Sequence, residues 1–123
     1  MRSSSAWTVD VGLLDLTLPT VEENLAVDEA LLVAADTRDG RAMLRFWEQP
    51  DPAVVLGASR RMAADARVDR CAEDGVPIVR RSSGGGSVLI GPGALNVTLI
   101  LPIAADPALA TVDGAQHAVM ERL

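Results

Sequence analysis

A short run of arginine, serine and glycine in the middle of the chain has the composition of an anion-binding site. Segment 80–88 begins with two arginines, continues with two serines and then contains three consecutive glycines. Glycine lacks a Cβ, so consecutive glycines can take positive φ and bring their N–H groups close to a ligand. Arginine adds a permanent positive charge and a forked set of donors. The run predicts a site for phosphate or carboxylate, although ordinary hairpin loops share a glycine-rich composition.

The bulk composition fits one folded domain. The chain has 123 residues, of which 49% are hydrophobic and 23% charged, enough for a hydrophobic core and too apolar for a disordered protein. Its net charge of −6 argues against general nucleic-acid binding, which needs a basic face. An acidic enzyme with a local basic pocket is more consistent. All 11 basic residues are arginine, so this chain cannot supply any step that needs a lysine.

Several other site classes are excluded by counts of single residue types. Cys71 is the only cysteine and His117 the only histidine, which excludes a disulfide and a multi-histidine metal centre. We expect no metal site and a surface position for His117. No apolar run reaches the roughly 18 residues of a membrane span, and residues 1–5 are too short and polar for a secretory signal. The expected location is therefore the cytoplasm, with no membrane partner.

The elements that must position the glycines alternate between strands and helices. Thr20 and Glu23 have the spacing of a capping box ahead of an Ala- and Leu-rich helix, and Gly75 suits the end of a second helix. A turn at 91–93 predicts that the strands on either side of it pair with each other. The expected strands are 7–18, 42–48, 53–56, 76–80, 87–90 and 94–101, and the expected helices are 21–36, 65–74 and 107–123.

Four motifs in a fixed order resemble the lipoate–protein ligase family. The similarity extends from about residue 9 to residue 101 and corresponds to the N-terminal half of such a catalytic domain. We therefore expect residues 1–123 to be the N-terminal part of a single domain. The motifs are Asn24-Leu25-Ala26-Val27-Asp28-Glu29-Ala30-Leu31-Leu32, Leu44-Arg45-Phe46-Trp47-Glu48, Val54-Val55-Leu56-Gly57 and Arg80-Arg81-Ser82-Ser83-Gly84-Gly85-Gly86-Ser87-Val88.

The resemblance implies a fold and a reaction. The fold is the α+β domain of biotin and lipoate ligases, which is class II synthetase-like, with a mixed, largely antiparallel sheet flanked by helices. The substrates are lipoate and ATP with Mg²⁺, which condense to an enzyme-bound lipoyl-adenylate. The lipoyl group then passes to a lysine of an acceptor domain. The implied acceptors are the E2 subunits of 2-oxoacid dehydrogenases and the glycine cleavage H protein.

The same resemblance assigns roles within the glycine motif. Acyl-adenylate formation brings two negative charges together, so the site must neutralise them. Successive side chains of a regular strand point to opposite faces, so only one of the two arginines can face the pocket. The implied contacts to ATP and the acyl-adenylate are Arg81, Gly86, Ser87, Val88 and Leu89; those to lipoate are Arg80, Gly84 and Gly85; supporting roles fall to Ser83 and Asn96.

Two alternative hypotheses for the function stay open, an octanoyl or lipoyl transferase and a non-catalytic binding half-domain. Family ligases use a lysine beyond the glycine motif, and this chain contains none, so we expect a fragment with little or no activity of its own. Octanoyltransferases of the same family instead form a thioester on a cysteine, which would also lie in the missing half. Their His-Gly-Pro-Gly element has Ile90 in place of histidine here. The second alternative is a half-domain that binds lipoate or nucleotide without catalysis.

A few remaining residues have two interpretations each. Asp28 and Glu29 diverge by about 100° on a helix, so a solvated or structural role is favoured over a catalytic pair. Trp47 is either a core residue or a wall of the acyl pocket. Asn96 is expected to brace the glycine loop rather than to contact substrate. Cys71 is expected to be a buried structural thiol, and Arg60 and Arg61 a solvated basic pair rather than contacts to ligand or acceptor.

Overall fold

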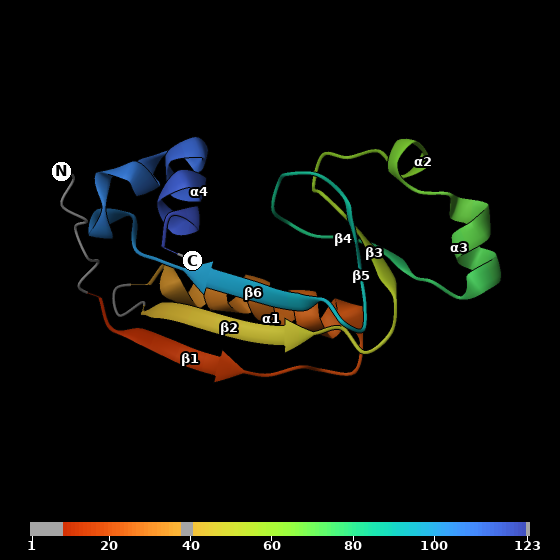
Figure 1. The fold of residues 1–123 in the computed structure, drawn as a ribbon, viewed down its shortest axis with the longest axis horizontal. Coiled ribbons are helices and arrows are strands. Elements are labelled where there is room, and N and C mark those ends of the chain that lie inside the picture. Colours follow the sequence, from red (N-terminus) through yellow and green to blue (C-terminus); the bar gives the residue numbers. More distant parts are fainter. Residues whose placement is uncertain (1–8, 38–40, 123) are drawn as a thin grey trace.

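The computed structural model describes residues 9–37 and 41–122, which form two three-stranded sheets (Figure 1). The strands of the first sheet, in spatial order, are β1 (Val11–Asp15), β2 (Ala42–Glu48) and β6 (Leu95–Ile100). Those of the second sheet are β4 (Ile78–Arg80), β3 (Ala53–Leu56) and β5 (Val88–Ile90). The helices are α1 (Val21–Ala35), α2 (Met62–Asp65), α3 (Val68–Asp74) and α4 (Val112–Met120), with short 3-10 turns η1 (Ile103–Ala105) and η2 (Pro107–Ala110).

Each sheet is mixed. β1 pairs with β2, and β3 with β4, in parallel, whereas β2 pairs with β6, and β3 with β5, antiparallel. Parallel neighbours need a crossover connection, and here α1 supplies it for the first sheet and α2 with α3 for the second. The predicted α+β class with mixed sheets and flanking helices is confirmed, and the strands divide between two sheets.

The helix boundaries follow the predicted end signals. Thr20 and Glu23 form the predicted capping box, in which Glu23 N donates to Thr20 Oγ1 and Thr20 N to Glu23 Oε2, both at 3.2 Å. Gly75 ends α3 in the left-handed conformation at φ 67°. The single helix expected over 65–74 is instead two helices, because Ala66 takes an extended conformation between them. The strand expected over 7–18 is shorter, and Trp7 lies outside the described residues.

Two predictions about the C-terminal part were wrong. The strands on either side of the 91–93 turn do not form a hairpin, since β5 pairs with β3 and β6 with β2. β6 aligns six residues with β2, whereas β5 is only three residues long and would offer a shorter ladder. The helix expected over 107–123 is interrupted at Thr111, whose extended backbone places its Oγ1 3.0 Å from Gly114 N as the cap of α4.

One hydrophobic cluster joins the two sheets to α1. Its buried members are Val21, Trp47, Ala53, Val55 and Ile90, which come from α1, β2, β3 and β5. Leu25 and Val79 pack against it. The second sheet is therefore fixed to the first through side chains of both.

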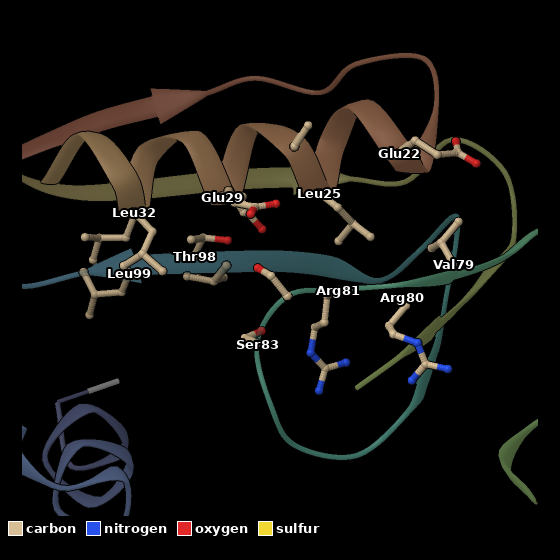
Figure 2. Close-up of a pocket in the computed structure, with 15 residues that line it drawn as sticks. Glu22, Leu25, Glu29, Leu32, Val79, Arg80, Arg81, Ser83, Thr98 and Leu99 are labelled. Atoms are coloured by element: carbon tan, nitrogen blue, oxygen red, sulfur yellow. The ribbon is translucent and has the colours of Figure 1, made fainter. Parts of the chain in front are cut away.

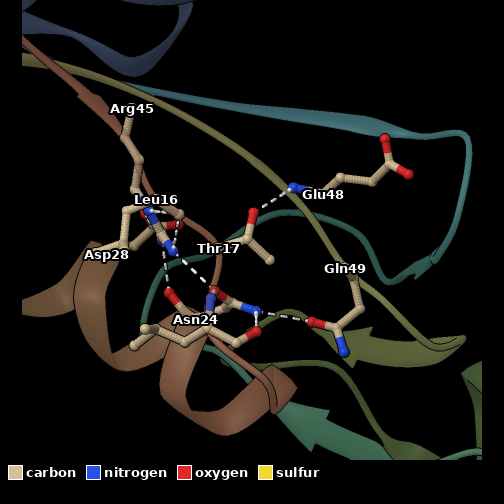
Figure 3. A network of polar contacts seen from close by, with 8 residues as sticks. Leu16, Thr17, Asn24, Asp28, Arg45, Glu48 and Gln49 are labelled. Atoms are coloured by element: carbon tan, nitrogen blue, oxygen red, sulfur yellow. Dashed lines mark hydrogen bonds and ion pairs between the residues drawn. The ribbon is translucent and has the colours of Figure 1, made fainter.

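A buried polar network clamps α1 to the first sheet (Figure 3). The Arg45 side chain is fully buried and donates to Asp28 Oδ1 at 2.7 Å, Asn24 O at 2.7 Å, Asn24 Oδ1 at 2.9 Å and Leu16 O at 3.0 Å. Asn24 Nδ2 in turn donates to Gln49 Oε1 at 3.0 Å. We call these residues the Arg45 network. It gives Asp28 a structural role, as predicted, and fixes the helix that forms one wall of the candidate site.

Candidate functional site

The glycine motif lies beside a groove of about 490 Å³ between α1, β6 and the end of β4 (Figure 2). The groove walls are apolar along much of their length. α1 contributes Leu25 and Leu32, and β6 contributes Val97 and Leu99. Arg81 lines the same groove on the glycine side. The site therefore combines a cation with apolar walls, which suits an acid with a hydrocarbon tail.

Charge is distributed unevenly around the groove. Glu22 and Glu29 line it from α1, together with Asp28, which is paired with Arg45. Carboxylates on that wall disfavour binding of an anion next to them, because like charges repel. The cationic groups lie on the opposite wall, at the end of β4 (Figure 2). An anionic group in the groove is thus favoured on the side of Arg81 and the glycines.

The two adjacent arginines have different partners. Arg80 Nη1 donates to Gly57 O at 3.0 Å, to Ala58 O at 3.2 Å and to Arg60 O, so it holds the connection after β3. Arg81 Nη2 donates to Gly84 O at 2.8 Å and Gly86 O at 2.7 Å, and so holds the glycines. Both line the groove, so the expectation that only one arginine could face it was wrong, because β4 ends at Arg80 and Arg81 lies outside the regular strand. Arg81 is the arginine attached to the glycines.

Residues 83–87, which we call the glycine segment, run close to the end of β3. Ala58 N donates to Ser83 O at 2.9 Å. A Cβ at Gly57 would lie 2.0 Å from Gly85 O, so only glycine allows this approach. Gly85 itself has φ +100°, which L side chains rarely adopt. These contacts hold the glycine segment against the connection between β3 and α2.

The N–H groups of the three glycines are free for a ligand. Gly84, Gly85 and Gly86 are all exposed. Within the described parts of the chain, no group accepts a hydrogen bond from their N–H groups. Unpaired N–H groups next to a guanidinium can bind phosphate or carboxylate oxygens.

The other end of the glycine segment is bonded to α2. Ser87 Oγ donates to Asp65 Oδ2 at 2.6 Å, and Arg60 donates to both Asp65 oxygens at 2.7 Å. The hydrogen bond from Arg60, with the one from Ser87, holds the pKa of the Asp65 carboxyl well below its usual range. The hydrogen bond to Asp65 raises the pKa of Arg60. Arg60 is therefore exposed, as expected, and in addition forms an ion pair with Asp65.

A smaller cavity of about 170 Å³ has Trp47, Val55, Val88 and Ile90 among its lining residues. Leu25, Asp28, Arg81, Val97 and Thr98 line both this cavity and the groove. Trp47 is only 4% exposed, and the Arg45 guanidinium carbon lies 5.0 Å from its ring centre. Its Nε1 has no hydrogen-bond partner among the described residues. Trp47 is thus both a core residue and a cavity wall, so the two interpretations hold together.

Five of the ten predicted site residues line the groove or the smaller cavity, and the other five, Gly84, Gly85, Gly86, Ser87 and Leu89, line neither. Arg80, Arg81 and Ser83 line the groove, and Val88 and Asn96 line the smaller cavity with Arg81. The side chain of Asn96 donates to Ala94 O at 3.5 Å, within its own strand segment, and not to the glycine segment. Leu89 is 70% exposed and lines neither space.

Sequence reasoning missed Asp65 and was wrong about Cys71. Asp65 is five residues from Arg60 and 22 from Ser87, a spacing with no periodic signal. Gly57 had a usable signal, because a glycine directly after an apolar strand often marks close backbone approach. Cys71 lies in α3 with intermediate exposure, so it is not the buried thiol that was expected. α3 is short and packs loosely, which leaves its side chains partly in solvent. His117 is exposed on α4, as predicted.

Residues 9–37 and 41–122 contain no group of three or more His, Cys, Asp or Glu side chains that could hold a metal ion. No helix in these ranges is long and apolar enough to cross a membrane.

The chain has the biotin/lipoate ligase-like fold, which solved lipoate–protein ligases share. In this chain the fold consists of the two mixed sheets and their flanking helices. A model of the lipoyl protein ligase A/B catalytic domain matches residues 20–121. The chain belongs to this family of acyl-attaching catalytic domains.

Curated relatives include both ligases and transferases. The chain is 33% identical over 102 residues to a candidate lipoate-protein ligase A of Aeropyrum pernix, an alignment that covers 81% of this chain and 38% of that protein. It is 39% identical over 67 residues to an octanoyltransferase of Carboxydothermus hydrogenoformans, covering 54% of this chain and 25% of the other. The chain thus spans between a quarter and two fifths of the length of these relatives.

Solved structures show the same likeness. A candidate lipoate protein ligase from T. acidophilum with bound lipoic acid superposes with a TM-score of 0.67 at 30% identity, covering 73% of this chain and 37% of that one. A bi-partite lipoate protein ligase from Thermoplasma acidophilum, described with its E2 lipoyl domain, gives 0.66 at 28%, covering 74% and 35%. A lipoate-protein ligase A bound with ATP gives 0.63 at 28%, covering 72% and 35%.

Proposed function

We propose that this chain is the N-terminal part of a lipoate–protein ligase domain and carries the lipoate and ATP subsites. The observation behind the proposal is the groove that Arg81 lines together with apolar side chains of α1 and β6, with the unpaired N–H groups of the three glycines beside it. Lipoate has a carboxylate and a hydrocarbon tail, which match the two parts of this groove. Bound lipoic acid and bound ATP in solved relatives support the same pair of substrates.

The reaction would run in two steps. A carboxylate oxygen of lipoate attacks the α-phosphorus of ATP, supplied with Mg²⁺, and the bond to the β-phosphate oxygen breaks with release of pyrophosphate. An acceptor lysine amine then attacks the acyl carbon, and AMP leaves. Arg81 and the N–H groups of Gly84, Gly85 and Gly86 would neutralise phosphate and carboxylate charge in the first step. The lipoyl acceptor would be a domain of the E2 or glycine cleavage H type.

Octanoyl transfer is the alternative chemistry in this family. It requires a group that activates a cysteine or the acceptor lysine. Ile90, at the position where octanoyltransferases carry histidine, is 8% exposed and belongs to the hydrophobic cluster. This position therefore offers no proton-transfer group, which supports the ATP-dependent reaction over octanoyl transfer. Binding of ATP to the chain separates the two chemistries, because the transferases do not use ATP.

The proposal predicts binding without turnover. We expect calorimetric titration to detect binding of both lipoate and ATP to the chain, and Arg81→Ala to weaken each by about tenfold, as for loss of a charged hydrogen-bond donor. Arg61→Ala is the matched control, since Arg61 is exposed and does not line the groove. Because the chain has no lysine, we expect no lipoate-dependent exchange of pyrophosphate into ATP. Equal effects of the two arginine variants would show that the groove is not the ligand site.

A further inference from the structure

The glycine segment is fastened at one end to the connection between β3 and α2 and at the other end to α2 itself. At one end Ala58 N donates to Ser83 O at 2.9 Å, and at the other Ser87 Oγ donates to Asp65 Oδ2 at 2.6 Å. We propose that Asp65 is a positioning residue of the ligand site, which holds the glycine segment through Ser87 while Arg60 holds the Asp65 carboxylate in place. This inference rests on the proposed function only for the identity of the ligand.

The geometry gives the Asp65 carboxylate a fixed orientation. Arg60 Nε donates to Oδ2 and Arg60 Nη2 to Oδ1, each at 2.7 Å, so the guanidinium and carboxylate planes meet through two parallel hydrogen bonds. Ser87 therefore donates to an oxygen whose position is already determined. Asp65 is 12% exposed, whereas Arg60 is 51% exposed, so the acceptor is the shielded member of the pair.

The backbone of Arg60 is also held. Arg80 Nη1 donates to the carbonyl oxygens of Gly57, Ala58 and Arg60. The connection that leads into α2, which carries Asp65, is thereby tied to the end of β4, next to the glycine segment. Arg80 and Asp65 act on the same connection from two sides, which explains why Arg80 need not contact a ligand to matter for the site.

The glycines need such an anchor because they have more conformational freedom than any other residue. Gly84, Gly85 and Gly86 are exposed and have no side chains of their own, and the Arg81 side chain holds only the carbonyls of Gly84 and Gly86. Ser87 is the first residue after them with a side chain that can be fixed. A loop ordered before the ligand arrives does not lose entropy on binding, so anchoring Ser87 should raise affinity.

The order of the glycine segment tests the anchor directly. We expect backbone ¹⁵N order parameters of the three glycines to be about 0.85 in the unaltered chain and below about 0.6 in Ser87→Ala and in Asp65→Ala. The double variant should be no more mobile than either single one, because both remove the same bond. Ser87→Thr keeps a hydroxyl and should restore order. Ser59→Ala is the control, since Ser59 lies in the same connection and its hydroxyl bonds to none of the described residues.

Binding of ATP then tests the functional part. The dissociation constant for ATP should rise about fivefold in Ser87→Ala and in Asp65→Ala, and no further in the double variant. Unchanged order parameters, or additive effects in the double variant, would overturn the inference. Increased mobility with unchanged ATP affinity would overturn the positioning role. Failure of the unaltered chain to bind ATP would contradict the proposed function, and the order parameters would still decide whether Asp65 anchors Ser87.

Discussion

Neighbouring residues of one type do different work in this site. Arg80 bonds three backbone carbonyls after β3, whereas Arg81 bonds two carbonyls of the glycine segment. β4 ends at Arg80, so the alternation of a regular strand does not separate the two arginines, and both line the groove. Asp65, in contrast, brings together two residues that are 27 positions apart in the sequence, because its carboxylate accepts hydrogen bonds from both Arg60 and Ser87. The role of a residue in this site therefore depends more on where the backbone places it than on its residue type.

The lowered pKa of Asp65 predicts how stability depends on pH. A carboxyl whose folded pKa lies below its unfolded value, near 3.8, stabilises the fold fully above that value and loses the contribution as pH falls through the folded pKa. The difference in unfolding free energy between the unaltered chain and Asp65→Asn should thus be constant from pH 7 to about pH 5 and shrink below about pH 4. Urea denaturation at each pH measures it.

Asp51→Asn provides the control for this pH dependence. Asp51 is exposed in the loop between β2 and β3 and has no ion pair with the described residues. Its variant should differ little from the unaltered chain at any pH. A difference for Asp65→Asn that already falls between pH 7 and pH 5 would show that the carboxyl is not held in its ionised form.

Two of the helix ends could be predicted from the sequence, whereas the pairing of strands could not. The capping box and the Gly75 helix end depend on a few adjacent residues, and both appeared as predicted. The pairing of β5 with β3 and of β6 with β2 depends on which strand edges are open, which no local pattern records. The glycine segment was found from composition, but its bond to Asp65 joins an element whose position comes from the crossover. Sequence therefore pointed to the candidate site, and it could not indicate the residues that support the glycine segment.

The approach of the β3 end to the glycine segment predicts a strict requirement at one position. Gly57→Ala would place a Cβ 2.0 Å from Gly85 O, so the two backbones must separate. We expect a loss of about 2 kcal/mol in unfolding free energy, as for other overpacked positions, together with weaker ATP binding. Gly84→Ala is the control, because nothing lies within 4 Å of its Cβ position. If both variants are equally stable in urea denaturation, the close approach does not exist in solution.

In the molecule as a whole, the hydrophobic cluster and the Arg45 network stabilise different contacts between elements. The hydrophobic cluster joins the two sheets, and the Arg45 network fixes α1 on the first sheet. Both together set the width of the groove, because its walls come from α1, β6 and the end of β4. Arg45 belongs to one of the four motifs of the family resemblance, but its role could not be predicted from the sequence. A buried arginine is recognised only when its hydrogen-bond partners are known.

Removing the buried guanidinium should destabilise the whole fold. Arg45→Met leaves the carbonyls of Leu16 and Asn24 and the Asp28 carboxylate without their donor. Loss of one partner from a buried ion pair costs about 3 kcal/mol or more, and we expect a loss of that size in urea denaturation. Arg41→Met is the control at an exposed arginine directly before β2 and should change stability by less than about 0.5 kcal/mol. Similar losses in both variants would refute the structural role of the network.

The pairing of β2 with β6 has a consequence for the order in which the molecule forms. Glu48 pairs with Leu95, so the second sheet and its helices are an insertion between two neighbouring strands. Contacts between residues far apart in sequence form slowly, because a long loop must close first. The β1–α1–β2 unit and the inserted sheet each have more local contacts. The groove is bounded by both and by β6, so it should be completed only in the last step of folding.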